Sequence, residues 1–136
     1  MNNDDVQYIN EISYGYWKAQ ALFVASEFDL FTLIGKRGKS GKVISKKLGT
    51  NLRATEMLLN ALVSLKLLSK SKDIFRNTAV SKRCLSKNGP AYQGDRIQHF
   101  HNMWDYWSGL DTAVMTGKPT AFYNAKKGVD KKRLRE

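Results

Sequence analysis

Few side chains in this sequence have the type and spacing that chemistry requires. His99 and His101 stand two residues apart, and in a helix this spacing points them to different faces, whereas paired metal ligands need a separation of three or four. No cluster of cysteines or carboxylates accompanies them, so we expect no metal site, although one histidine could line a substrate pocket. Cys84, the single cysteine, has no base partner suggested by the sequence, and we expect it to be structural rather than nucleophilic.

A glycine-rich basic segment at residues 35–42 superficially resembles a phosphate-binding loop. That motif needs four residues between its first glycine and the Gly-Lys-Ser/Thr triplet, after a buried strand. Counting back from Gly-Lys-Ser at 38–40 places Leu33 where the glycine should stand, and the second Gly-Lys pair is followed by Val43, which has no hydroxyl for magnesium. We therefore expect a solvated basic loop, and we predict no catalytic, cofactor-binding or metal-binding residue in the chain.

Length, charge and cysteine content favour one cytoplasmic domain. The chain has 136 residues and a net charge of +11, and its one cysteine fits a reducing compartment. Charged residues interrupt the most apolar stretch, residues 14–34, and residues 1–5 are acidic and polar, so we expect neither a membrane span nor a signal peptide. The positive charge is concentrated, because six of the twelve residues at 36–47 and six of the eleven at 126–136 are basic.

The hydrophobic periodicity predicts a mainly α-helical fold with a small β-hairpin. We expect a helix over residues 6–28, a helical turn at 29–34, and helices at 40–48 and 53–65 that are capped by Ser40 and by Thr50 or Asn51. In the first of these two capped helices, Val43, Ile44 and Leu48 should point inward. Further elements are expected as strands at 67–71 and 74–78, a helical turn at 79–85 and a long helix at about 91–116. This order is that of a winged helix-turn-helix core with long N- and C-terminal helices.

These segments together resemble a known family. The runs that carry the resemblance are residues 15–22 and 25–31, the Ile-Ser-Lys-Lys-Leu-Gly at 44–49, the leucine-rich 58–63 with 67–68, the Phe-Arg-Asn-Thr at 75–78, and residues 107–110 with 113–119. In order and spacing they resemble the N-terminal dimerisation domain of plant-type and bacterial S-adenosylmethionine-dependent small-molecule O-methyltransferases. The resemblance covers roughly residues 9–119. We therefore expect residues 1–119 to form this domain, with 120–136 as a basic tail or the start of a linker.

The resemblance implies a homodimer whose interface also helps to close an acceptor pocket. We expect Ile9, Ile12, Tyr16, Trp17, Trp104 and Trp107 in an isologous dimer interface, and Met103 and Trp107 in the wall of the pocket. Relatives methylate hydroxyl groups of small aromatic or polyketide-like molecules. The family's S-adenosylmethionine loop has no counterpart in this sequence, so we expect this segment alone to bind no cofactor and to lack methyltransferase activity. An excised domain, a truncated product and one subunit of a split enzyme, with a separate methyltransferase partner, all remain open.

The alternative reading is a winged-helix DNA-binding transcriptional regulator. Its recognition helix would be residues 53–66, whose outward positions are Arg53, Ala54, Glu56, Met57, Asn60 and Ser64. Arg53 and Lys66 are the only cations on that helix and Glu56 would repel phosphates, so we expect poor reading of base edges and no nucleic acid as a specific partner. The basic loop, with Lys70, Lys72 and Arg76, could still give weak, salt-sensitive phosphate contact.

Overall fold

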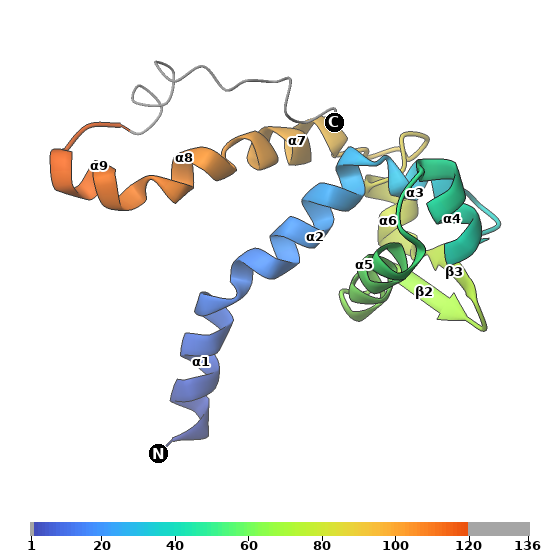
Figure 1. The fold of residues 1–136 in the computed structure, drawn as a ribbon, viewed down its shortest axis with the longest axis horizontal. Coiled ribbons are helices and arrows are strands. Elements are labelled where there is room, and N and C mark those ends of the chain that lie inside the picture. The colour runs from blue at the N-terminus through green and yellow to red at the C-terminus, as the bar shows by residue number, and fades with distance from the viewer. Residues whose placement is uncertain (1, 120–136) are drawn as a thin grey trace. The chain divides into compact units, whose positions relative to one another are not determined.

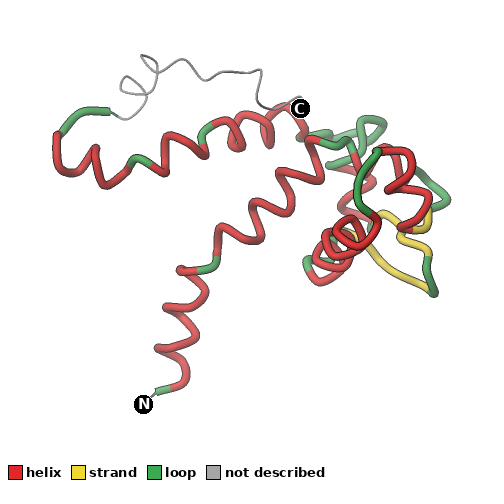
Figure 2. Tube along the Cα trace, viewed as in Figure 1, coloured by secondary structure: helices red, strands yellow, loops and turns green. Residues whose placement is uncertain are grey.

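The computed structural model describes residues 2–119, so the basic tail expected at 120–136 lies outside the described residues. The chain divides into two units, residues 1–98 and residues 99–136. The first unit holds a small core of helices and strands, which follows two consecutive helices at the N-terminus (Figures 1 and 2). No helix within residues 2–119 is both long and apolar enough to cross a membrane.

The elements of the first unit follow the expected order. Its N-terminal helices are α1 (Asn3–Ser13) and α2 (Gly15–Glu27). The core that follows consists of α3 (Leu30–Ile34), β1 (Lys39–Ser40), α4 (Gly41–Leu48), α5 (Leu52–Ser64), β2 (Leu68–Ser71), β3 (Ile74–Asn77) and α6 (Ala79–Cys84). The prediction of a mainly α-helical fold with a small β-hairpin is therefore confirmed.

The sheet has a strand that the sequence did not indicate. Its order is β1-β3-β2 with antiparallel neighbours, and the hairpin between β2 and β3 turns at Lys72-Asp73 as expected. The prediction of a loop throughout residues 35–41 was wrong at Lys39–Ser40, which pair with Phe75 and Ile74. A strand of two residues is too short to show an alternation of apolar and polar side chains, so the sequence does not reveal it. The strand forms because β3 offers an unpaired edge. Gly38, at φ +80°, allows the chain before β1 to approach β3 closely, because a Cβ at this position would lie 2.6 Å from the Phe75 carbonyl oxygen.

The hydrophobic core lies between the helices and the sheet. Its largest fully buried apolar side chains are Leu30, Phe31, Ile34, Ile44, Leu59, Leu62, Leu68 and Phe75. Ser40 and Asn51 cap α4 and α5 by accepting hydrogen bonds from the backbone N–H groups of Val43 and Ala54. The prediction that Val43 points inward was wrong, because Ile44 and Leu48 share the inward stripe of α4 and Val43 lies beside it, exposed.

The two long helices expected at the ends of the chain are broken. The first bends at Tyr14, between α1 and α2. The second is divided into α7 (Gly94–Asn102), α8 (Trp104–Ser108) and α9 (Leu110–Thr116), with breaks at Met103 and Gly109. Met103 keeps right-handed helical backbone angles, whereas Tyr14 and Gly109 leave the helical region, with ψ angles of +10° and +15°. Each break involves a single residue, so the apolar periodicity of the sequence continues across it and cannot reveal it. Glycine, which has a low helix propensity, stands at or beside two of these breaks, at Gly15 and Gly109.

A buried amide at the end of β3 holds the C-terminal turn of α3. Asn77, which is 5% exposed, donates from Nδ2 to the carbonyl oxygens of Phe31 at 2.8 Å and Gly35 at 3.3 Å. The Phe31 carbonyl oxygen also accepts the backbone N–H of Gly35 at 3.3 Å, and Gly35 lies just past the last turn of α3, so the amide adds hydrogen bonds to this helix end from a distant strand. It joins segments that lie 46 residues apart in the sequence.

We expect Asn77→Ala to lower the free energy of unfolding by about 1–3 kcal/mol, the usual cost of leaving buried polar groups unpaired. Asn77→Asp should cost more, because a carboxylate would face two carbonyl oxygens. Chemical denaturation at constant protein concentration measures both. Asn88→Ala, at an exposed position, is the control and should change stability by less than about 0.5 kcal/mol. Equal stabilities for Asn77→Ala and the control would contradict this role of Asn77.

Candidate dimerisation surfaces

The helix α1 carries an apolar face that nothing in the described chain covers. None of its residues is buried, and Val6, Tyr8, Ile9 and Ile12 lie on one side of it at helical spacing. Ile9 is 58% exposed and Ile12 is 63% exposed. An isolated helix of this length is marginal in water, and most helical stability in proteins comes from packing of the apolar face. A partner that covers this face would therefore stabilise α1.

The start of α2 presents a group of aromatic side chains. Tyr14 and Trp17 stack with ring centroids 5.5 Å apart, and Tyr16 meets Trp17 edge-on at 6.0 Å. Trp17 is 61% exposed and Tyr16 is also largely exposed. Farther along α2 the helix joins the core, where Ala25 is fully buried. Apolar side chains point to several sides of this helix, interrupted by Lys18, Gln20 and Glu27, which is typical of a helix covered on more than one side.

The second unit has an exposed apolar seam of its own. Trp107 is 69% exposed, and Leu110, Val114 and Met115 of α9 are exposed as well. Met103, expected in the pocket wall, and Trp104, expected in the interface, are both partly buried. Leu110, Val114 and Tyr8 of α1 are exposed as well, although they are not among the six residues expected in the interface. Leu110 and Val114 follow Trp107 at steps of three and four residues, so the apolar periodicity of the sequence already indicates this seam.

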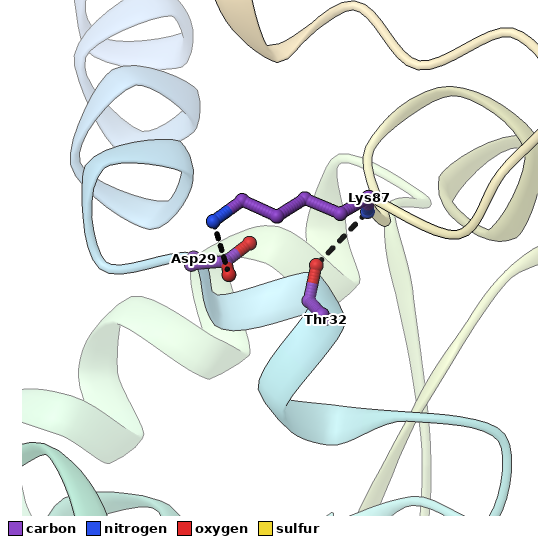
Figure 3. Close-up of polar contacts among 3 residues, drawn as sticks. All are labelled: Asp29, Thr32 and Lys87. Carbon is purple, nitrogen blue, oxygen red and sulfur yellow. Dashed lines mark hydrogen bonds and ion pairs between the residues drawn. The ribbon is translucent and has the colours of Figure 1, made fainter.

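An ion pair at the base of α2 fastens the segment after α6 to the core. Lys87 Nζ lies 3.0 Å from Asp29 Oδ2, and the backbone N–H of Lys87 donates to Thr32 Oγ1 at 2.9 Å (Figure 3). Asp29 sits at φ +51°, between α2 and α3, in the left-handed region that aspartate tolerates better than most residues. The contact joins residues 58 positions apart and therefore ties the α2–α3 junction to the chain that leads toward α7.

We expect the ion pair between Lys87 and Asp29 to weaken at high pH. The hydrogen bond to the Asp29 carboxylate, followed by the attraction of its charge, raises the pKa of Lys87 above the ordinary 10.5. A raised pKa gives stability that is complete below the ordinary pKa and is lost as pH rises through the folded-state pKa. The melting temperature of the wild type should therefore exceed that of Lys87→Gln at pH 8, by a small margin because both groups are exposed, and the margin should shrink at pH 11.5. Lys82→Gln, at an exposed position, should show no such change in margin.

The basic loop and Cys84, which were considered for phosphate binding and for catalysis, make contacts that stabilise the fold. The Ser40 hydroxyl caps α4, and the Glu56 side chain lies so close to Gly41 that a Cβ there would meet Glu56 Cγ at 2.7 Å. The N-terminus of α4 is therefore covered by a carboxylate, which opposes binding of a phosphate group to the backbone N–H groups of this helix end. Cys84 is partly buried against the core. Within the described range, no three histidine, cysteine or carboxylate side chains group together as metal ligands.

A core of this kind, joined to helices whose apolar faces remain uncovered, defines a helical module for self-association. The family model of the O-methyltransferase dimerisation domain matches residues 10–87. The chain belongs to this family. None of the observations on residues 2–119 favours the DNA-binding regulator, and the exposed face of α5 carries Glu56 and Met57 as expected.

Similar proteins of known type agree with this assignment. Acetylserotonin O-methyltransferase of Gallus gallus is 33% identical over 122 residues, which are 85% of this chain and 35% of that protein. An O-methyltransferase family protein of Burkholderia thailandensis has a similar fold, with a TM-score of 0.77 and 30% identity over 94% of this chain and 38% of that one. Human N-acetylserotonin methyltransferase, solved in complex with SAM, gives a TM-score of 0.77 at 25% identity, covering 86% of this chain and 36% of its own. The chain spans about a third of the length of these relatives.

Proposed function

We propose that residues 1–119 form a homodimer and serve as the dimerisation module of an S-adenosylmethionine-dependent O-methyltransferase of the cytoplasm. The interface consists of the apolar face of α1 with Ile9 and Ile12, the aromatic start of α2 with Tyr16 and Trp17, and the helix α8, which carries Trp104 and Trp107. One observation carries the proposal: α1 has no buried residue in the single chain, although its apolar side chains share one face. The family match over residues 10–87 supports it.

The module would also form one wall of the acceptor pocket in the complete enzyme. Met103 and Trp107 are the residues proposed for this wall, because the resemblance to the family implies them; Met103 is partly buried and Trp107 is 69% exposed. The acceptor would be a small molecule with a hydroxyl group, by analogy with the acetylserotonin methyltransferases among the relatives. Methyl transfer itself would belong to a catalytic domain or a separate methyltransferase subunit.

S-adenosylmethionine, which serves the complete enzyme in this proposal, does not fit the residues described. Family members bind it at a glycine-rich turn between a strand and a helix. Within residues 2–119, the strand β1 leads through Gly41 into α4, but a single glycine stands at this junction, Glu56 fills the space against it and Ser40 is engaged as a cap. We therefore assign no cofactor contact and no catalytic step to this segment.

Light scattering behind a sizing column tests the proposed dimer. The protein is injected over a hundredfold range of concentration, down to the low micromolar range. A mass of twice the chain's 15.5 kDa that persists on dilution is the expected result. A folded monomer at every concentration would overturn the proposal, since the uncovered face of α1 would then need another partner.

A further inference from the structure

The charge of this protein is strongly segregated. Residues 35–87 contain fourteen lysines and arginines against two carboxylates, a net charge of +12. Residues 1–34 contain one lysine against five carboxylates, a net charge of −4. The helices proposed for dimerisation are therefore slightly acidic, while the core carries all of the excess positive charge of the described chain. A dimer that forms through these helices would not neutralise the positive charge of the core.

Six of these cations lie on adjoining elements, and we call them the basic surface: Lys36, Arg37, Lys42, Lys46, Lys47 and Arg76. The loop that holds Lys36 and Arg37 lies against Arg76, because a Cβ at Gly38 would come within 2.6 Å of Arg76 Cγ. The strand β1, which pairs with β3, leads directly from this loop into α4. On α4, Lys42 and Lys46 are four residues apart and share one side of the helix.

The basic surface is exposed and its charges are not neutralised internally. All six side chains are exposed, and none of them makes an ion pair with a carboxylate of residues 2–119. Glu56 lies at the N-terminus of α4 and Asp73 in the hairpin turn, and these are the two carboxylates of the core. Six positive charges on neighbouring elements repel one another, and this repulsion destabilises the folded chain. An anionic ligand would reduce the repulsion.

The composition around these cations indicates which anion fits. Residues 35–87 contain a single aromatic side chain, Phe75, which is buried, so the surface has no platform on which unpaired bases could stack. Protein interfaces have an apolar, aromatic centre and few lysines, whereas four of these six residues are lysines and Val43 is the apolar side chain exposed among them. A regular array of phosphates that is bound without base contacts fits both the lack of an exposed aromatic side chain and the prevalence of lysines.

We propose that the basic surface binds the phosphate backbone of double-stranded nucleic acid without sequence preference. The interaction is electrostatic, through release of counterions, and it is separate from the dimer interface. It differs from the action of a regulator, because the exposed face of α5, with Glu56 and Met57, does not read bases. With about six phosphate contacts, the logarithm of the binding constant should fall against the logarithm of salt concentration with a slope of roughly −5.

Fluorescence anisotropy of the full chain with labelled 20-base-pair duplexes of two unrelated sequences tests this proposal. We expect equal binding of both sequences at 25 mM salt and a steep loss by 200 mM. The variant Lys36→Gln/Arg37→Gln/Arg76→Gln should bind at least about tenfold more weakly at 50 mM salt and should reduce the salt slope by about 3. The control Lys18→Gln/Lys82→Gln/Lys118→Gln removes the same charge elsewhere and should stay within about twofold of the wild type. The basic residues at 126–136 are identical in both variants, so a difference between the variants isolates the surface.

Other outcomes would overturn the proposal. No binding at 25 mM salt, or equal losses in the two triple variants, would show that the surface has no specific part in phosphate binding. Tighter binding of a single strand would indicate base contacts that the surface lacks. Tighter binding of polyglutamate of equal charge would indicate an acidic protein as the partner instead. Circular dichroism of both variants confirms that they are folded before binding is compared.

Discussion

Replacing both Ile9 and Ile12 with aspartate is expected to leave the chain monomeric at concentrations where the wild type is dimeric. Both side chains lie on the uncovered face of α1 and are more than half exposed in the single chain, so the substitutions remove little from the folded protomer. In an isologous interface each position counts twice. At about 1.5 kcal/mol for each buried side chain, the lost burial corresponds to roughly a 10⁴-fold weaker dimer.

A matched pair of substitutions on the other side of α1 separates this effect from added charge. Gln7 and Asn10 lie away from the apolar face, and Gln7→Asp/Asn10→Asp adds the same two negative charges. This control should remain a dimer by light scattering, with a dissociation constant within about tenfold of the wild type. Dissociation of both variants to the same extent would mean that charge on α1, rather than its apolar face, decides assembly.

Replacing Phe31 with alanine is expected to destabilise the fold more than any other single change considered for this protein. Phe31 is 1% exposed, and it stands where α3, the sheet and the Asn77 cap meet. Truncating a buried phenylalanine costs about 3–5 kcal/mol, because the apolar transfer energy is lost and a cavity remains. A small domain has only about 5–15 kcal/mol of stability, so the melting temperature should fall by at least about 12 °C.

Phe28 provides the control for this change. It lies three residues before Phe31, at the end of α2, and it is 42% exposed. Phe28→Ala should therefore cost less than half of what Phe31→Ala costs, when both are measured by thermal unfolding at the same protein concentration. Similar losses for the two variants would show that the junction of α2 and α3 is more deeply buried in the assembled protein than in the single chain.

Local sequence patterns were sufficient to predict most of the elements and the family. The apolar stripe of α5, the capping serine before α4 and the hairpin around Lys72-Asp73 are each encoded within a few residues. Such signals survive because helix and hairpin geometry repeats over short distances along the chain. The uncovered apolar face of α1 also follows from periodicity, although the sequence could not tell whether the same chain covers it.

Only the tertiary structure decided the features that depend on distant partners. The strand β1 exists because β3 offers it an edge, and two residues have no periodicity of their own. Asn77 and Lys87 reach residues 46 and 58 positions away, so neither partner can be read from the neighbouring sequence. The placement of Arg76 beside the glycine-rich loop has the same origin. A local pattern records which face of an element is apolar, whereas the packing of the elements determines which groups meet across that face.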